Sequence, residues 1–298
     1  MRRSVVATVL SVTACLSAAQ PEPGFDGARA FEHVRQLVAI GPRVAGSPGA
    51  ARAREYITRQ LEAVGVAASE QPFEARTPLG MVRMVNLRAT LPGPDGAGGR
   101  RLLIGGHYDT KLFSEFTFVG ANDGGSSAAF LIELARVLGD RRRPMPVELV
   151  FFDGEEAVVD WFKEDDNTYG SRHYVAAARR DGSAKDIAAL ILVDMIGDRD
   201  LRIMRESQST PWLTDIIWSA ARRLGRKEFV EEELLVEDDH LPFLRAGIPA
   251  ADIIDLDYPA WHTEADTLDK VSPASLQAVG DVLLAALPDV FARLQERQ

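Results

Sequence analysis

The sequence of 298 residues contains a single cysteine, Cys15, which excludes an internal disulfide. A closed structural zinc site is also disfavoured, because such sites are normally built from several thiolates. The sequence lacks a basic excess as well: it has 34 Lys and Arg residues against 44 Asp and Glu residues, and a formal net charge of -10. This balance argues against nucleic acid as a partner, because Lys and Arg are what neutralise phosphate groups.

Long apolar runs are scarce too. After residue 25 none is long enough to predict a transmembrane helix. The N-terminus has the features of an export signal, with Arg2 and Arg3 before a short apolar stretch over residues 5–12 and small residues up to Ala19. We therefore predict a signal over residues 1–19 and an exported protein that is periplasmic, secreted or lipid-anchored to the cell envelope.

Two cleavage sites fit this signal. Residues 12–15, Val-Thr-Ala-Cys, look like a bacterial lipoprotein cleavage box, which would make Cys15 a lipid-bearing first residue. Cleavage after Ala19 would instead discard Cys15. Both alternatives stay open, and under either one the mature domain has no cysteine available for a disulfide.

The rest of the sequence has an ordinary globular composition, 46% hydrophobic and 26% charged. Residues 20–27 are rich in Pro and Gly and are predicted to be a linker, followed by one domain over residues 28–298. Apolar spacing predicts helices over residues 28–40, 50–64, 126–138, 171–180, 211–224 and 273–295. Strands are predicted over residues 66–73, 82–91, 101–106, 147–152, 188–194, 201–204 and 248–254.

This alternation of strands and helices predicts a three-layer α/β/α fold with a central mixed, mostly parallel sheet. Ser47 and Pro48 are predicted to begin the second helix, with serine as its cap. The turn-rich residues 92–99 predict a hairpin loop. His33 lies on the first amphipathic helix and is assigned no function.

The most informative motif is Asp-Gly-Glu-Glu at residues 153–156, directly after the apolar run 147–152. Two neighbouring glutamates that directly follow a buried strand are not explained as ordinary solvated surface charges. Because adjacent residues point in different directions, one glutamate can hold a metal while the other faces the substrate as a proton carrier. The motif therefore predicts a metal-assisted active site that contains Glu155 and Glu156.

Further potential metal ligands follow the ends of the predicted strands or precede a helix, where an α/β sheet places its binding site. Each alone has a plainer interpretation: a histidine at a strand end is often structural, Asp123 would serve as a helix cap, and Asp194 as a loop hydrogen-bonder. Their joint occurrence favours Zn²⁺ in an open catalytic site, with mixed imidazole and carboxylate ligands. The candidates are His107, Asp109, Asp123, Glu155, Glu156, Asp194 and His262.

These motifs, in this order, resemble peptidase clan M28, the zinc aminopeptidase fold, over about residues 30–290. Within the clan the chain is most similar to the glutaminyl-peptide cyclotransferases, which convert N-terminal glutamine to pyroglutamate. The finer resemblance rests on five segments: His-Tyr-Asp-Thr-Lys-Leu-Phe at residues 107–113, Asp-Trp at 160–161, Tyr-Gly-Ser-Arg-His at 169–173, Glu-Asp-Asp-His-Leu-Pro-Phe-Leu-Arg at 237–245, and Trp261 before His262.

The resemblance implies a role for each matching residue. One zinc ion would be held by Asp123, Glu156 and His262, and Glu155 would shuttle the proton. Asp194 and Asp238 would form a carboxylate hydrogen-bond network with Glu155. The pocket for the glutamine side chain would be formed by Lys111, Phe113, Trp161, Tyr258 and Trp261. The implied substrates are the N-termini of peptides or proteins, and a monomer is expected.

Several departures keep a second hypothesis open. Asp252 stands where a cyclase has histidine, Glu237 replaces a glutamine of animal enzymes, the paired cysteines of those enzymes are missing, and residues 263–271 are more similar to an aminopeptidase. A dizinc aminopeptidase would use Asp123 as a bridge, with His107 and Asp194 on one ion and Glu156 and His262 on the other. Glu155 would then deprotonate a metal-bound water. A non-catalytic binding module predicts a degraded ligand set, whereas this set is intact.

Overall fold

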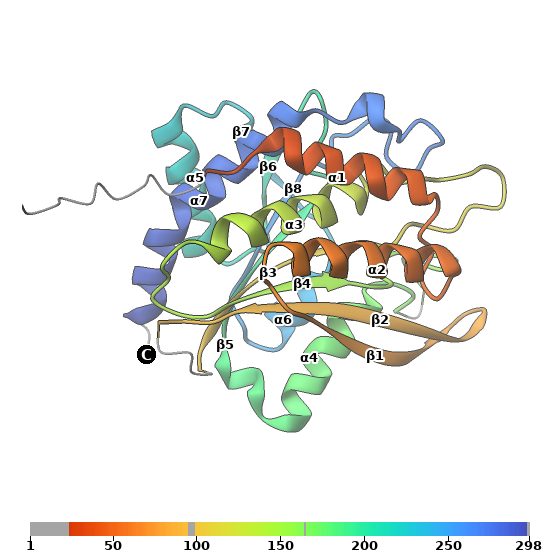
Figure 1. Cartoon of the computed structure of the whole chain (residues 1–298), viewed down its shortest axis with the longest axis horizontal. Coiled ribbons are helices and arrows are strands. Elements are labelled where there is room, and N and C mark those ends of the chain that lie inside the picture. Colours follow the sequence, from red (N-terminus) through yellow and green to blue (C-terminus); the bar gives the residue numbers. More distant parts are fainter. Residues whose placement is uncertain (1–23, 95–98, 164, 297–298) are drawn as a thin grey trace, which may run out of the picture.

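The computed structural model describes residues 24–94, 99–163 and 165–296 (Figure 1). The predicted signal over residues 1–19, Cys15 and residues 20–23 of the predicted linker lie outside the described residues. The export signal and its two cleavage sites therefore stay predictions.

Two helices open the described chain, α1 (Gly27–Ile40) and α2 (Pro48–Ala63). The carboxylate of Asp26 caps α1 by accepting hydrogen bonds from the first-turn backbone N–H groups. Ser47 caps α2 by accepting from Ala50 N, with Pro48 at the first helical position, so the predicted start of this helix is confirmed.

His33 joins α1 to α2, because its Nδ1 lies 2.7 Å from the Tyr56 hydroxyl. Burial, with the charge of Arg29 as a second cause, lowers the pKa of His33 from 6.5 to about 4. The folded state thus favours neutral imidazole. Its contribution to stability is complete above pH 6.5 and is lost as the pH falls toward 4, because the unfolded chain takes up the proton first.

We expect this loss to appear as a pH-dependent destabilisation. Between pH 7 and pH 4.5 the free energy of unfolding of the wild type should fall by about 2 kcal/mol more than that of His33→Gln, which cannot titrate. Urea unfolding of both proteins at the two pH values measures the difference. Equal losses in the two proteins would contradict the assignment.

The central sheet has six strands in the order β1-β2-β4-β3-β5-β8. Strand β3 pairs in parallel with β4 and β5, and β5 with β8, whereas β1-β2 and β2-β4 are antiparallel pairs. The predicted mixed sheet is therefore confirmed. Its strands are β1 (Ala68–Thr77), β2 (Gly80–Leu91), β3 (Arg101–His107), β4 (Val147–Phe152), β5 (Ile187–Asp194) and β8 (Ala250–Ile254).

The prediction of a hairpin at residues 92–99 is wrong. Strand β4 lies between β2 and β3, and residues 87–91 of β2 pair with β4. Turn residues indicate that the chain reverses there, but they do not fix which strands become neighbours. The hairpin joins β1 to β2 instead, through a tight turn in which Gly80 has φ +117°.

One strand and one α-helix, both short, were not predicted: β7 (Phe229–Leu234) and α6 (His240–Arg245). Strand β7 pairs in parallel with β6 (Ile203–Glu206) to form a separate small sheet. It carries three consecutive glutamates, all exposed, so its sequence lacks the apolar alternation that predicts a strand.

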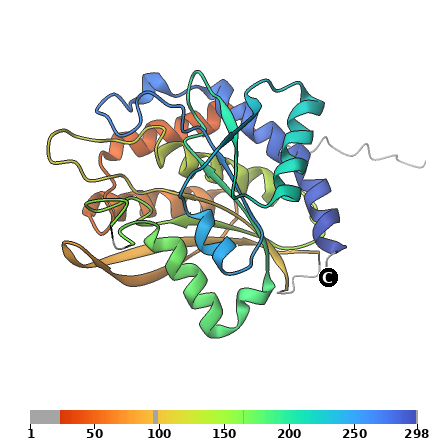
Figure 2. The same ribbon diagram turned by 180° about the vertical axis from the view of Figure 1, so that it is seen from behind.

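Helices cover both faces of the central sheet (Figures 1 and 2). Alternate residues of β5 show the division: Ile191 and Val193 pack in the larger core cluster, whereas Leu190 and Leu192 pack in the smaller one. The larger cluster contains α1 and α2 with α3 (Gly125–Gly139), α5 (Pro211–Leu224) and α7 (Pro273–Gln295). The smaller one contains α6 and α4 (Tyr169–Asp181).

The long helix α7 corrects one expectation. By length and composition it is apolar enough to cross a membrane, contrary to the prediction that no segment after residue 25 is. However, 67% of its most apolar window is buried in the structure, as is usual for a core helix.

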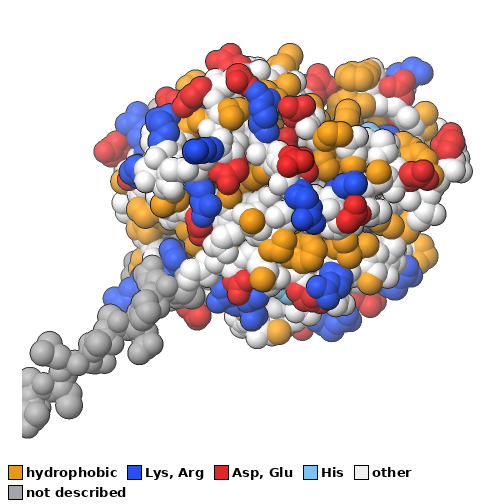
Figure 3. Space-filling view, turned by 90° about the horizontal axis from the view of Figure 1, so that it is seen from above, with side chains coloured by type: hydrophobic (Ala, Val, Ile, Leu, Met, Phe, Trp, Pro, Cys, Tyr) orange, Lys and Arg blue, Asp and Glu red, His pale blue; other side chains and the backbone are white. Residues whose placement is uncertain are grey.

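On the face of the molecule shown in Figure 3, acidic and basic side chains are interspersed with apolar ones.

The order of the strands determines where a site can form. From β3 the chain runs through α3 to β4 on one side, and then back through α4 to β5 on the other side of β3. These two connections pass over opposite faces of the sheet. Such a reversal leaves room beyond the carboxyl end of the middle strand, where ligands bind in open α/β sheets.

Candidate active site and metal centre

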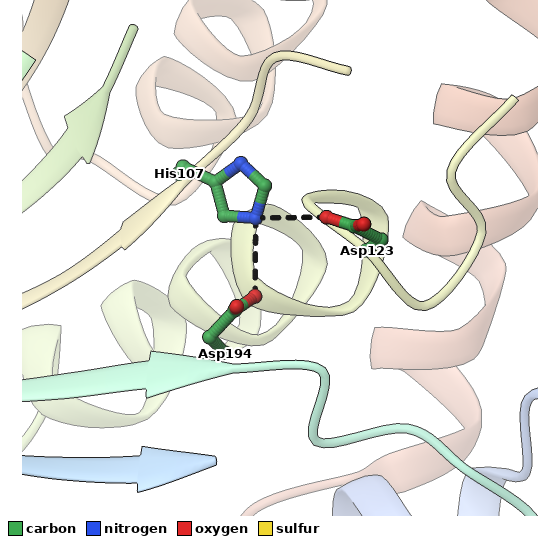
Figure 4. A group of neighbouring side chains, drawn as sticks. All are labelled: His107, Asp123 and Asp194. Carbon is green, nitrogen blue, oxygen red and sulfur yellow. Dashed lines mark hydrogen bonds and ion pairs between the residues drawn. The ribbon is translucent and has the colours of Figure 1, made fainter. Parts of the chain in front are cut away.

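The carboxyl end of β3 carries His107, which faces two aspartates from neighbouring segments. Its Nε2 lies 3.1 Å from Oδ1 of Asp194, the last residue of β5, and 3.3 Å from Oδ1 of Asp123, just before α3 (Figure 4). These three side chains are buried, and they form a group that could hold a metal ion.

A second such group shares Asp123 with the first. His262 Nε2 lies 3.1 Å from Glu156 Oε1 and 3.4 Å from Asp123 Oδ2. The structure therefore brings together all five residues of the predicted one-metal and two-metal sites, with Asp123 between them.

The spacing of these ligand atoms fits a zinc ion. Ligands held tetrahedrally at about 2.0–2.1 Å from zinc lie roughly 3.3 Å from one another. The distances from each histidine to its two carboxylates are close to this value, and all ligand atoms of a group lie within 4.8 Å of one another. In addition, no described residue donates a hydrogen bond to Asp123 Oδ2 or Glu156 Oε2, although both atoms are buried. Buried carboxylate oxygens without donors are suited to a cation.

Asp123 does not act as a helix cap, the alternative that its position allowed. Helix α3 is capped by Gly124, whose φ is +70°, and no side chain caps it. The carboxylate of Asp123 is therefore free to face the two histidines. His262 has φ +54°, an unfavourable backbone conformation for a residue with a side chain, as is common at functional sites.

The loop after β4 is built so that Glu155 and Glu156 enter the site side by side. Gly154 makes the turn with φ +69°, and a Cβ there would lie 2.4 Å from Met84 Sδ. The two carboxylate oxygens of Asp109 accept hydrogen bonds from the backbone N–H groups of Glu155 and Glu156, at 3.2 and 3.3 Å. Asp109, one of the candidate ligands, thus belongs to neither metal group and fixes this loop instead.

Glu155 is almost fully buried, with 6% of its surface exposed. Burial raises its pKa well above that of an ordinary glutamate, the charge of His107 opposes the shift, and the charges of Glu156 and Asp238 add to it. His107 Nδ1 lies 3.7 Å from Glu155 Oε2. A carboxyl group with a raised pKa beside a metal site is suited to taking up and returning a proton.

The histidine of the second group is strongly basic in this setting. Burial disfavours its charged form, but the nearby carboxylates of Asp123 and Glu156 raise the pKa of His262 to about 10. A metal ion that binds here must displace a proton from the ring. Metal affinity should therefore weaken as the pH falls.

Asp194 and Asp238, the two aspartates of the predicted network, are buried like Glu155. Burial and the charge of Asp194 raise the pKa of Asp238 well above its usual range. Burial and the charge of Asp238 do the same for Asp252. Asp194 Oδ1 also accepts hydrogen bonds from Met195 N at 2.7 Å and from Ser127 Oγ at 3.2 Å.

Behind this network lie two residues to which the sequence reasoning assigned no role. His240 is fully buried, with Nε2 3.1 Å from Glu206 Oε2 and Nδ1 3.6 Å from Asp252 Oδ2. Asp252, noted from the sequence only as a departure from the cyclase pattern, thus faces a histidine from α6. The motif at residues 237–245 could have drawn attention to His240, but Glu206 lies in β6 without any motif.

Two of the predicted pocket residues contact the candidate ligand His262. The Trp261 ring stacks on it at 4.4 Å between centroids, and the Phe113 ring meets it edge-on at 5.7 Å. Trp261 is 44% exposed, so its ring is open to solvent beside the site. Lys111 reaches the same region: its Nζ donates to Ala157 O and lies 3.9 Å from Glu156 Oε2.

The other two predicted pocket residues lie differently. Tyr258 is buried in a small apolar cluster with Met195, and its hydroxyl donates to Asp266 at 2.7 Å. Trp161 is partly exposed on the loop between β4 and α4, where its carbonyl accepts from Asn167.

Known proteins are similar to this chain in sequence and in fold. The sequence profile of peptidase family M28 matches residues 86–287. A crystal structure of an Acidobacteriales bacterium glutaminyl cyclase is similar with a TM-score of 0.86 and 38% identity, covering 94% of this chain and 100% of that one. A glutaminyl-peptide cyclotransferase-like protein of Bos taurus is 31% identical over 86% of this chain and 73% of its own length.

The fold also occurs in exopeptidases. A Zn-dependent exopeptidase from Parabacteroides distasonis is similar with a TM-score of 0.80 and 25% identity, covering 88% of this chain and 98% of that one. The resemblance predicted from the sequence motifs, to the M28 enzymes and to the glutaminyl cyclases among them, is confirmed. Since the profile matches more than half of the sequence, this chain belongs to peptidase family M28.

Proposed function

We propose that the protein is a zinc-dependent glutaminyl-peptide cyclotransferase that converts N-terminal glutamine of peptides or proteins to pyroglutamate and releases ammonia. The observation that carries the proposal is a buried carboxyl group, Glu155, directly beside a complete ligand group in Asp123, Glu156 and His262. The likeness to glutaminyl cyclases supports it.

The residues of this chain divide the reaction between them. Bound zinc would be held by Asp123, Glu156 and His262 and would polarise the γ-carboxamide oxygen of the substrate. The substrate's own α-nitrogen attacks the carbonyl carbon of the γ-carboxamide (Cδ), a C–N bond forms there, and the bond from the same carbon to the leaving nitrogen breaks. In total one proton moves from the attacking nitrogen to the leaving ammonia, and Glu155 carries it.

The neighbours of Glu155 suit it to this task. The charge of Asp238 raises the pKa of Glu155, and the charge of Asp194 raises that of Asp238. Burial acts in the same direction on both. A carboxylate with a raised pKa is a stronger base toward the attacking nitrogen than an exposed glutamate, and its protonated form is populated nearer neutral pH, where it can give the proton to the leaving nitrogen.

The substrate side chain would lie against the rings around His262. Trp261 and Phe113 supply apolar surface next to the ligand group, and we propose Trp161 and Tyr258 as further parts of this wall. Lys111, close to Glu156, would face the same pocket. Apolar walls orient a small amide and exclude water, which this reaction does not use.

One specific observation favours a second candidate, a dizinc aminopeptidase. In the group of His107, Asp123 and Asp194 the histidine lies about as far from its two carboxylates as in the group of Asp123, Glu156 and His262. Against it stands the state of Asp194 Oδ1, which already accepts hydrogen bonds from Met195 N and Ser127 Oγ. Two donors occupy the lone pairs of this oxygen, so only Oδ2 of Asp194 would remain for a second ion.

An activity comparison separates the two candidates. The purified protein is assayed for ammonia release from Gln-Xaa peptides and for hydrolysis of aminoacyl-arylamides, and its zinc content is measured. We expect ammonia without free amino acid, and one zinc per chain. Arylamide hydrolysis with two zinc ions per chain would favour the aminopeptidase.

We also propose that the protein is exported. This proposal rests on the signal-like residues 1–19 and includes the two alternatives for Cys15, a lipid anchor or removal with the signal.

A further inference from the structure

The loop that carries Asp123, residues 119–124, is held on one side by Asp266. The two carboxylate oxygens of Asp266 accept hydrogen bonds from Asn122 N at 2.9 Å and from Asp123 N at 3.1 Å. Its backbone carbonyl accepts from Ala121 N at 3.3 Å. Three successive N–H groups of the Asp123 loop thus donate hydrogen bonds to Asp266, which lies far from this loop in sequence.

The carbonyl groups of the same loop are held by Arg43. Its guanidinium donates to Val119 O at 2.6 Å and to Gly120 O at 2.8 Å. A third bond, from Nε to Tyr108 O at 2.9 Å, reaches the segment just after His107. Arg43 is fully buried, and burial lowers its pKa only to about 10, so it stays charged at neutral pH.

The residues around this loop are packed so closely that there is no room for a side chain at Gly120. Gly120 has φ +50°, and a Cβ there would lie 2.4 Å from Asp123 O and 3.3 Å from Arg43 Nη2. Arg43 donates hydrogen bonds to carbonyl groups of the loop, and Asp266 accepts them from its N–H groups. Neither residue belongs to a candidate metal group. Their position lets them fix where Asp123 points without competing for the ion.

We propose that Asp266 and Arg43 are positioning residues that hold the Asp123 loop from opposite sides and thereby set the affinity of the protein for zinc. The inference rests on the metal site of the proposed function. Its physical basis is that groups which orient a metal ligand influence affinity nearly as much as the ligand itself. A loop that must be ordered on binding loses affinity by the cost of ordering it.

The chain supplies a matched control for Asp266. The buried carboxylate of Asp166 accepts from Val158 N, Val159 N and Asp160 N, and from the Tyr169 hydroxyl. Asp266 has the same kind of partners, successive backbone N–H groups and the Tyr258 hydroxyl. Asp166, however, holds residues 158–160, which include no candidate metal ligand, whereas the backbone N–H of Glu156, earlier in the same loop, is held by Asp109.

The test compares Asp266→Asn with Asp166→Asn. Each substitution keeps the size of the side chain and replaces one acceptor oxygen by an N–H donor group. The zinc dissociation constant is measured by competition with a chelator, and the thermal unfolding of each zinc-free protein is recorded. We expect Asp266→Asn to weaken zinc binding about 10- to 100-fold. Asp166→Asn should leave the dissociation constant unchanged even if it lowers the melting temperature.

Two results would overturn the inference: wild-type zinc affinity in Asp266→Asn, or the same loss of affinity in both variants. If Asp266→Asn does not fold, Arg43→Lys decides, because lysine keeps the charge but cannot hold several carbonyl groups in one plane. Weaker zinc binding by a folded Arg43→Lys supports the inference, and unchanged binding overturns it. A wild-type protein that binds no zinc would instead refute the metal site of the proposed function.

Discussion

Glu155→Gln should lower kcat for ammonia release by about 10²- to 10⁴-fold, the usual contribution of a general acid and base. Glutamine has the size of glutamate but cannot take up the proton of the attacking nitrogen or return it to ammonia. The bound zinc should stay at the wild-type level, because Glu155 belongs to neither group of ligands. Steady-state kinetics at saturating Gln-Xaa peptide, together with metal analysis of the same sample, measures both quantities.

The neighbouring residue provides the control. Glu156→Gln changes a ligand of the same size in the same loop, so both zinc content and turnover should fall. Wild-type kcat in Glu155→Gln would refute its role as proton carrier. A loss of zinc in Glu155→Gln would mean that the two glutamates have been assigned the wrong way round.

Asp123→Asn should remove zinc and turnover together. Asp123 is the one residue present in both ligand groups, so its loss affects the site whether one ion binds or two. We expect zinc affinity to fall by more than about 100-fold, because loss of a group behind a ligand already costs 10- to 100-fold. Chelator competition and ammonia release at rising zinc concentration measure the change.

His107→Gln is the informative partner of this variant. With a single ion on Asp123, Glu156 and His262, the zinc content of His107→Gln should remain one per chain. With two ions, the protein should lose the one that His107 and Asp194 hold. Unchanged zinc affinity in Asp123→Asn would contradict both arrangements.

The sequence could predict that most of the candidate ligands lie together with Glu155, because these residues end or follow apolar strands. His107, Asp194 and the glutamate pair each directly follow or end a buried run, and the carboxyl ends of parallel strands meet at one edge of a sheet. The order of the strands was not predictable in this way. Which strand becomes the neighbour of β2 depends on long-range packing, and residues 92–99 carry no information about it.

Arg43 and Asp266 show what local patterns miss. Both act on backbone atoms of a distant loop, at residues 119–124, through hydrogen bonds that any sequence in that loop can make. The side chains of residues 119–124 therefore give no indication that Arg43 or Asp266 contacts this loop. Glu206 and His240 were missed for a related reason, since they approach each other only when α6 packs beside β8.

The three proposed ligands Asp123, Glu156 and His262 have a consequence for the chain as a whole. Glu156 and His262 lie 106 residues apart in sequence, and Asp123 precedes both. An ion held by them closes two long loops, as a covalent cross-link would, and reduces the freedom of the unfolded chain. In a protein with one cysteine, a bound metal would thus act as the staple that disulfides provide in many exported proteins, and chelation would lower its resistance to heat as well as its activity.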